Sequence, residues 1–199
     1  MDALEALERQ NYKVHPNSKT IRIIQDKFLQ KIHLAAHGVP LPDFMSTPTV
    51  EAAVKAGKEF GYPFMLKNRR MAYDGKGNAV VSSEEEIVDA FRKLGCTVDN
   101  SQSAFDVYAE RWAAFSKELA VMIVRTGSGV VSYPVVETVQ KDNICHVVMA
   151  PAQIAASSLQ EACEVAKLAI SSFDGIGIYG VELFLLSDGS IKLNEIAPR

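Results

Sequence analysis

The hydrophobic and polar positions in the first half of the chain recur every three to four residues, a period that is typical of amphipathic helices. This pattern predicts three helices, at residues 18–38, 48–60 and 83–94. In the first helix we expect Ile21, Ile24, Phe28, Ile32 and Ala35 to form the apolar face. The candidate residues at the helix starts are Ser18, Thr47-Pro48 and the capping-box pattern Ser83–Glu86, and a glycine follows or ends each helix.

One stretch, Phe64–Val81, has two apolar runs around a polar, glycine-rich centre. It predicts a strand that ends at Lys67, a loop at Tyr73–Gly77 and a second strand. Two glycines around a lysine allow backbone N–H groups to approach a phosphate, and Lys67 and Lys76 would add positive charge. A β-hairpin with solvated lysines explains the same pattern, so the stretch alone leaves both interpretations open. If Lys67 binds phosphate, we expect Lys67→Met to leave folding intact, because methionine keeps the packing of the side-chain stem.

From Val107 onward the apolar positions alternate with a period of two, which predicts strands. We expect these at residues 107–112, 117–125, 130–139, 144–150, 176–186 and 190–197, with a turn at 126–129. A single helix is predicted to open at Ser157 or Ser158, and the aperiodic stretch 96–106 is predicted to be a loop. The pattern indicates an α+β protein with antiparallel sheets.

Composition narrows the function classes further. The chain has 199 residues, 48% of them hydrophobic and 23% charged, with a net charge of −3, which argues against a general nucleic-acid binder. No apolar run is long enough to span a membrane, so we expect a cytoplasmic protein without a membrane partner. The three cysteines form no C-x-x-C pair and predict neither disulfides nor a zinc site. His33 and His37 lie four apart on a predicted helix, but with no third ligand nearby a solvated face is the favoured interpretation over a metal site.

The last two predicted strands place two carboxylates together. If Asp188-Gly189 forms a two-residue turn, Ser187 faces Ser190, and the same register places Glu182 opposite Glu195. Facing carboxylates destabilise a sheet unless a positive charge lies between them, and a divalent cation with oxygen ligands, such as Mg²⁺, is the natural candidate. The alternative is that each glutamate pairs with a lysine or points to water.

Five segments in this order resemble the ATP-grasp fold: LKNRRMAYDGKGNAVV, YAERWAAFSKELAVMIVR, YPVVETVQKDNICH, GVELF and LNEIAPR. More specifically, they resemble the N5-carboxyaminoimidazole ribonucleotide synthetases, which in fungi and plants form the first part of phosphoribosylaminoimidazole carboxylase. The resemblance covers essentially all 199 residues. It implies an α+β, ATP-grasp fold with two α/β lobes whose antiparallel sheets clasp ATP.

The resemblance also implies a domain organisation. The ATP-grasp domain is expected at residues 18–199, with a small lobe at 60–112, a larger catalytic lobe at 113–199, and residues 1–17 as the end of a preceding domain or a linker. Family members carry an upstream Rossmann-like domain and continue beyond the APR motif into a C-terminal domain. We therefore expect this chain to be a fragment fused to flanking domains in a longer protein, and leave a homo-oligomer open.

The implied ligands are ATP with Mg²⁺, or Mn²⁺ in its place, and the substrates aminoimidazole ribonucleotide and bicarbonate. Implied nucleotide-binding positions are Lys27, Lys67, Ala72, Tyr73, Asp74, Gly75, Lys76, Gly77, Asn78, Glu110, Arg111, Trp112, Ala113, Glu118, Gln140, Asn194 and Glu195. Implied positions of other kinds are Tyr73, Asp74 and Lys76 for the ribonucleotide, Glu182 and Glu195 for the metal, and Lys76 and Arg199 for catalysis.

Two positions depart from the family pattern. Gln140 stands where some members have a histidine, and Ala197 stands where many ATP-grasp enzymes have a metal-binding asparagine. The second departure shifts the expected metal shell toward Asn194 or water.

The implied reaction is activation of bicarbonate by the γ-phosphate of ATP to carboxyphosphate, followed by carboxylation of the ribonucleotide's exocyclic amine. Phosphoryl transfer depends mainly on positioning and charge neutralisation, which fits a site of lysines, carboxylates and backbone amides. The alternatives are another ATP-grasp carboxylate–amine ligase and a nucleotide-binding module without turnover. We expect the fragment by itself to be poorly active, because small displacements of reacting groups reduce rates steeply.

Overall fold

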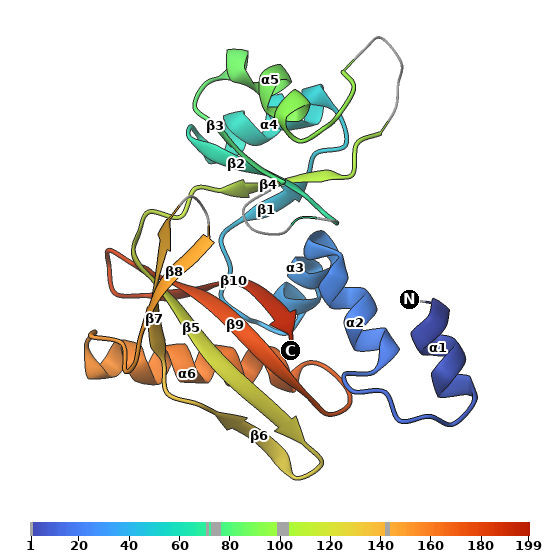
Figure 1. Ribbon diagram of the computed structural model, residues 1–199. Helices are drawn as coiled ribbons and strands as arrows, with labels where there is room; N and C mark the ends of the chain where they lie inside the picture. Colours follow the sequence, from blue (N-terminus) through green and yellow to red (C-terminus); the bar gives the residue numbers. More distant parts are fainter. Residues whose placement is uncertain (1, 71, 73–76, 99–103, 142–143) are drawn as a thin grey trace. The chain divides into compact units, whose positions relative to one another are not determined.

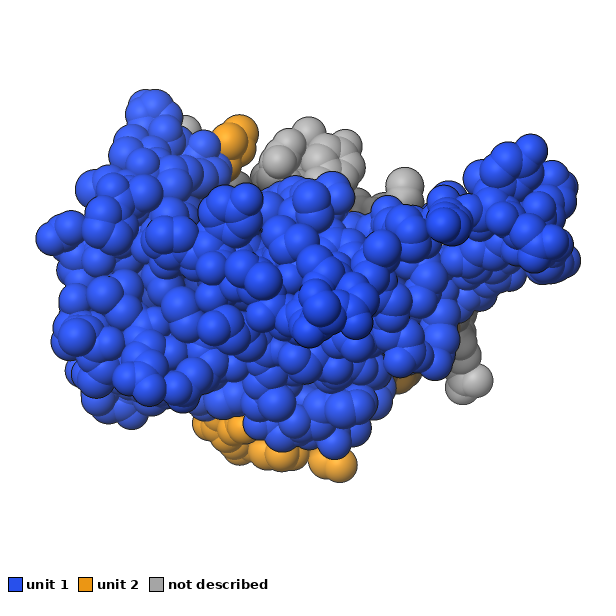
Figure 2. All heavy atoms as spheres, turned by 90° about the horizontal axis from the view of Figure 1, so that it is seen from below, with its two compact units in different colours: residues 1–41, 114–141, 145–199 blue, residues 42–113, 142–144 orange. Residues whose placement is uncertain are grey.

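The computed structural model describes residues 2–70, 72, 77–98, 104–141 and 144–199. The chain divides into two compact units, shown in different colours in Figure 2: a larger one of residues 1–41, 114–141 and 145–199, and a smaller one of residues 42–113 and 142–144. The smaller unit thus begins before residue 60, where the small lobe was expected to start. None of the helices in the described ranges is long and apolar enough to cross a membrane.

The larger unit combines four helices with an antiparallel sheet (Figure 1). The helices are α1 (Asp2–Arg9), α2 (Ser18–Gln25), α3 (Lys27–Ala36) and α6 (Ala156–Ser171). The strands are β5 (Phe115–Thr126), β6 (Gly129–Ser132), β7 (Val136–Lys141), β8 (Ile144–Met149), β9 (Gly177–Leu186) and β10 (Ile191–Pro198). Their order in the sheet is β10-β9-β5-β7-β8, with β6 paired to β5.

The two faces of this sheet differ in character. Alternate residues of the central strands, such as Leu119, Val121 and Val181, are buried in one apolar core with residues of α6. Because neighbouring residues of a strand point to opposite faces, Glu118 and Glu182 lie on the other face. The core therefore fixes the sheet from one side and leaves the second face for polar side chains.

The predicted helix 18–38 is wrong in two respects. It is interrupted at Asp26, whose backbone is extended and whose Oδ1 accepts hydrogen bonds from the N–H groups of Phe28 and Leu29, so that α3 starts afresh at Lys27. This break resets the helical phase, and the buried face of α3 consists of Gln30, Lys31 and Leu34, whereas Ile32 is 46% exposed. The N-cap of α2 is Asn17, whose Oδ1 accepts from Thr20 N at 2.8 Å, and not Ser18.

The smaller unit is a four-stranded antiparallel sheet covered by helices. Its elements are β1 (Phe44–Ser46), α4 (Val50–Phe60), β2 (Phe64–Asn68), β3 (Asn78–Val81), the 3-10 turn η1 (Glu84–Glu86), α5 (Ile87–Lys93) and β4 (Val107–Arg111), and its strand order is β1-β4-β2-β3. Phe64, Leu66 and Ala109 belong to an apolar core with residues of α4 and α5. Lys67 and Glu110 alternate with these core residues and so lie on the opposite face of the sheet.

Several predicted boundaries shift for local reasons. Helix α4 is capped by Thr49, whose Oγ1 accepts from Ala52 N at 3.2 Å, so Pro48 precedes the helix. The stretch 130–139 forms two strands, because proline at position 134 cannot donate a ladder hydrogen bond. Ser83 opens only the 3-10 turn without a side-chain cap. Helix α6 starts at Ala156, before both predicted serines.

Candidate functional site

The register between β9 and β10 changes at Asn194. Leu193 pairs with Leu183, whereas Glu195 pairs with Glu182, so Asn194 is the extra residue of a β-bulge. Along β10, positions 191, 193 and 196 are buried, whereas Asn194 and Glu195 are half-buried. The bulge therefore directs the side chains of both Asn194 and Glu195 away from the core.

The predicted pairing of Glu182 with Glu195 is confirmed, although the turn used to derive it is wrong. The hairpin loop has three residues, Ser187–Gly189, with Leu186 N donating to Ser190 O at 2.9 Å and Gly189 N donating to Leu186 O at 3.0 Å. Gly189 has a φ of 86°, which suits the last position of such a loop. The longer loop shifts the register by one residue, and the bulge at Asn194 shifts it back.

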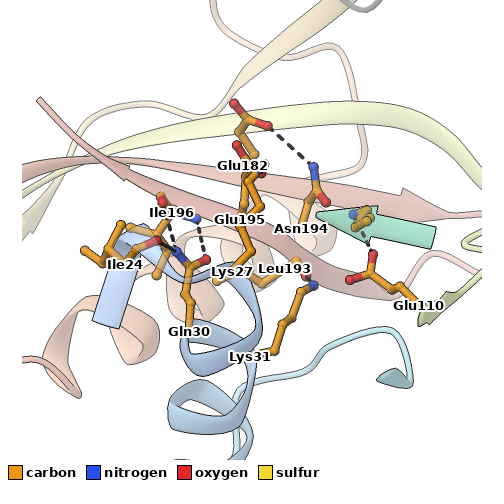
Figure 3. Close-up of polar contacts among 11 residues, drawn as sticks. Ile24, Lys27, Gln30, Lys31, Glu110, Glu182, Leu193, Asn194, Glu195 and Ile196 are labelled. Atoms are coloured by element: carbon orange, nitrogen blue, oxygen red, sulfur yellow. Dashed lines mark hydrogen bonds and ion pairs between the residues drawn. The ribbon is translucent and has the colours of Figure 1, made fainter. Parts of the chain in front are cut away.

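The carboxylate pair lies in a polar network (Figure 3). Lys27 Nζ is 2.5 Å from Glu195 Oε2, and Asn194 Nδ2 is 3.5 Å from Glu182 Oε2. Burial is the main cause that raises the pKa of Glu182 to about 7, and the Glu195 carboxylate adds to it. Glu118 raises this pKa further, whereas Lys27 and Arg199 lower it. Burial and the neighbouring carboxylates thus outweigh Lys27 and Arg199, so the ionised form of Glu182 is disfavoured in the ligand-free protein.

The two glutamates differ in their counter-charge. Glu195 forms an ion pair with Lys27, which was the alternative to a metal site, whereas Glu182 has no ion pair within the described ranges. Two carboxylates and the amide oxygen of Asn194 are hard oxygen donors, which suit Mg²⁺ or Mn²⁺. The described residues contain no group of three or more His, Cys, Asp or Glu side chains that could hold a metal. A cation here would therefore complete its shell with water or phosphate oxygens.

Three further predicted residues lie on the same face of the larger sheet. The guanidinium group of Arg199 lies over Gly180, where a Cβ would be only 3.2 Å from Arg199 Nε. Glu118 on β5 pairs with Phe184 on β9. Burial raises the pKa of Glu118, and a hydrogen bond with the Gln140 side chain opposes this shift. The fold thus brings Arg199, Glu118 and Gln140 to the face that carries Glu182.

Two other sequence interpretations concern His33 and the three cysteines. His33 Nε2 lies 3.0 Å from Ser172 Oγ, and its ring stacks on Phe173, so His33 packs against the loop after α6 instead of facing solvent or a metal. Burial lowers its pKa. Cys96, Cys145 and Cys163 are free thiols, as predicted.

In the smaller unit, Lys67 and Glu110 form a buried ion pair. Lys67 Nζ is 3.0 Å from Glu110 Oε1, and the two side chains are 10% and 4% exposed. The alternative that Lys67 is a solvated surface lysine is therefore wrong. The pair joins neighbouring strands β2 and β4 on the face opposite the apolar core.

The residues after Glu110 have separate surroundings. Arg111 donates to Asp43 Oδ2 at 2.7 Å and to the carbonyl oxygen of Phe60 at 2.8 Å, so its side chain binds the C-terminal end of α4. Only its backbone groups fit the expected role beside a nucleotide. Trp112 is 41% exposed and Ala113 follows it at the end of this unit.

The glycine-rich segment is described in part. Tyr73, Asp74, Gly75 and Lys76 lie outside the described residues, whereas Ala72, Gly77 and Asn78 lie within them. Gly77 has a φ of 94°, and a Cβ at this position would lie 2.7 Å from Ala72 Cβ. Its carbonyl oxygen accepts from Asn68 N at 2.8 Å, which continues the pairing of β2 with β3.

Gly77→Ala should destabilise the smaller unit by more than backbone strain alone. A left-handed φ at a non-glycine residue costs roughly 1–3 kcal/mol, and the clash with Ala72 adds to this cost. Gly95→Ala is the matched control, because Gly95 has a φ of 82° but no atom within 4 Å of its Cβ position. Thermal unfolding should give the larger loss for Gly77→Ala, and equal losses would show that Ala72 yields without cost.

The fold and this site define the class of the protein. The ATP-grasp domain family matches residues 32–199, and the chain belongs to this family. Over 200 residues it is 48% identical to phosphoribosylaminoimidazole carboxylase of Schizosaccharomyces pombe, covering 100% of this chain and 35% of that protein.

Solved structures give the same relationship. Carboxyaminoimidazole ribonucleotide synthase from Aspergillus clavatus, complexed with ATP, is similar with a TM-score of 0.88 and 44% identity over 98% of this chain and 50% of the other. The N5-carboxyaminoimidazole synthase of Aspergillus clavatus in complex with ADP and 5-aminoimidazole ribonucleotide has a TM-score of 0.87 and 42% identity over 98% of this chain and 49% of the other. The chain thus spans about a third of the first relative and half of these structures.

Proposed function

We propose that this chain is the ATP-grasp part of an enzyme that carboxylates aminoimidazole ribonucleotide with ATP and bicarbonate in purine biosynthesis. The observation that carries the proposal is the carboxylate pair Glu182–Glu195, which a β-bulge sets on a polar sheet face in a chain similar over its whole length to enzymes of this reaction. The two units then correspond to the two lobes of the domain, and residues 1–17 to the end of a preceding domain or a linker. A cytoplasmic location and fusion to flanking domains belong to the same proposal.

The larger unit supplies the proposed metal and phosphate groups. Glu182, Glu195 and Asn194 would hold Mg²⁺ or Mn²⁺, which supplies charge neutralisation for the nucleotide's phosphates. Lys27, next to Glu195, is then placed to contact a phosphate. Glu118 is assigned to the ribose hydroxyls, and its hydrogen bond with Gln140 orients the carboxylate.

The smaller unit supplies the remaining nucleotide contacts in this proposal. Lys67 provides a positive charge that contacts phosphate, and backbone groups from Glu110 to Ala113 form hydrogen bonds with the adenine. The segment from Ala72 to Asn78 covers the phosphates, with Tyr73, Asp74 and Lys76 also assigned to the ribonucleotide. Gly77 permits the close backbone approach that such a segment needs.

The proposed chemistry has two steps. A bicarbonate oxygen attacks the γ-phosphorus of ATP, ADP leaves, and carboxyphosphate forms. The exocyclic amine of the ribonucleotide then attacks the carboxyl carbon, phosphate leaves, and the amine nitrogen loses a proton. The guanidinium group of Arg199, held over Gly180, is assigned to the negative charge of bicarbonate and carboxyphosphate.

Full-length protein should release ADP at a full rate only when ATP, bicarbonate and aminoimidazole ribonucleotide are all present, apart from a slow bicarbonate-dependent background. The measurement is ADP release with each component omitted in turn. Glu164→Gln, which changes an exposed glutamate of α6, is the control and should behave as wild type. ADP release with another amine or carboxylate and none with this substrate would indicate a different ligase. Binding of Mg-ATP without any turnover would indicate a regulatory module.

A further inference from the structure

The outer edge of β10 is bound by side chains and by the segment after α3. Among the described residues, strand β10 pairs with one other strand, β9. On the other edge, Leu193 N donates to Pro40 O at 2.8 Å, and Lys31 Nζ donates to Leu193 O at 3.3 Å. The next backbone groups bound on this edge belong to Ile196, and both of its groups contact Gln30.

Gln30 binds Ile196 as a neighbouring strand would. Its Oε1 accepts from Ile196 N at 2.9 Å, and its Nε2 donates to Ile196 O at 3.0 Å. The same Nε2 also donates to Ile24 O at 3.2 Å, so both the oxygen and the nitrogen of the side-chain amide are hydrogen-bonded. Gln30 is 1% exposed, and no solvent can replace these bonds. Figure 3 shows the Gln30 side chain with its contacts to Ile24 and Ile196 drawn as dashed lines.

The spacing of these contacts depends on the bulge. In a regular strand, residues two apart present their backbone groups to the same edge. Here Leu193 and Ile196, which are three apart, both use the outer edge, because Asn194 is the extra residue between them. A one-residue slip to the regular register would move Ile196 off Gln30 and turn the Glu195 side chain toward the core.

We infer that Gln30 is a positioning residue for the metal site, in that it holds β10 in the bulged register that places Glu195 and Asn194 beside Glu182. This inference rests on the proposed function for the identity of the ligand. Gln30 does not touch the ligand: it acts through Ile196, the residue next to Glu195. Residues that orient metal ligands by hydrogen bonds from outside the coordination shell typically contribute 10–100-fold to metal affinity or activity.

The test is Mn²⁺ binding in the presence of ADP, measured on the full-length protein by the EPR signal of free Mn²⁺. Gln30→Leu keeps the approximate volume but removes all three hydrogen bonds, and should weaken Mn²⁺ binding by about tenfold or more. Gln30→Met, whose side chain is closer in shape to glutamine, also lacks the three hydrogen bonds and should weaken Mn²⁺ binding to a similar extent. Thr20→Val is the control, because Thr20 is 1% exposed and donates to Asp174 O at 3.0 Å, a hydrogen bond that does not involve β10.

The control separates positioning from stability. Thr20→Val should lower the melting temperature as Gln30→Leu does, but should leave Mn²⁺ affinity within about twofold of wild type. If Gln30→Leu does not fold, the uncharged Gln30→Met decides. If the wild-type protein binds Mn²⁺ with ADP and the folded Gln30 variants bind it with the same affinity, this inference alone is overturned. A wild-type protein that binds no Mn²⁺ with ADP would overturn the proposed function together with it.

Discussion

Lys67→Met should lower the free energy of unfolding of the smaller unit by about 3–5 kcal/mol, because it removes one partner of a buried ion pair. This result would contradict the sequence-based expectation that the variant folds normally. Lys67→Met combined with Glu110→Leu should recover most of the loss, since both charges are then replaced by apolar groups. Lys55→Met, on the exposed side of α4, is the control and should change stability by less than about 0.5 kcal/mol.

The double variant also separates folding from nucleotide binding. It restores the packing but still lacks the Lys67 charge, so ATP affinity should remain reduced by about 1.5–3 kcal/mol. Chemical denaturation and calorimetry with Mg-ATP measure the two quantities independently. A double variant as unstable as Lys67→Met would show that Lys67 stabilises the unit by contacts other than its pair with Glu110.

Glu182→Gln should stabilise the ligand-free protein at pH 8 and leave it almost unchanged at pH 4. The pKa of Glu182 is raised from 4.5 to about 7, mainly by burial and then by Glu195, with Glu118 adding to the shift and Lys27 and Arg199 opposing it. Between these values the folded state binds more protons than the unfolded state, so stability falls as pH rises from about 4.5 and the full cost is present above about 7. The shift corresponds to an upper bound of roughly 3–4 kcal/mol.

Melting temperatures across pH 4–8 test this prediction. The difference between Glu182→Gln and wild type should grow through the window from 4.5 to 7. Glu164→Gln, on the exposed side of α6, should show no such growth. A Glu182→Gln variant that melts below wild type at pH 8 would indicate that the carboxylate stabilises the fold through a structural contact.

The alternation of apolar residues predicted the antiparallel sheets well, because burial of one sheet face fixes a period of two. The bulge at Asn194 was missed, although the sequence carries its signal: the apolar residues Ile191, Leu193 and Ile196 of β10 change spacing from two to three. The pairing of Glu182 with Glu195 was predicted correctly only because a longer hairpin loop and the bulge shift the register in opposite directions.

The helices show where local pattern fails. Asp26 was assigned to a helix interior because the apolar spacing runs through it, but its carboxylate caps α3 and resets the helical phase. The buried face of α3 then contains Gln30 and Lys31, whose polar ends bind backbone groups more than 160 residues away in the chain. Hydropathy cannot identify such residues, because their burial depends on partners brought near only by the tertiary fold.

The charge of Lys67 was identified from sequence, but its partner was not. Glu110 lies 43 residues away, and only the pairing of β2 with β4 brings the two side chains together. The same holds for Arg111, whose contacts with Asp43 and Phe60 make it a structural residue of the smaller unit.

The central claim, that Glu182 and Glu195 share a metal ion in the nucleotide complex, is tested most directly by the Mg-ATP-induced shift in melting temperature. Each single variant, Glu182→Gln and Glu195→Gln, should lose most of the wild-type shift, and the double variant should lose little more, because the two carboxylates act as a unit. Single variants that keep the full shift while melting lower without ligand would contradict the claim.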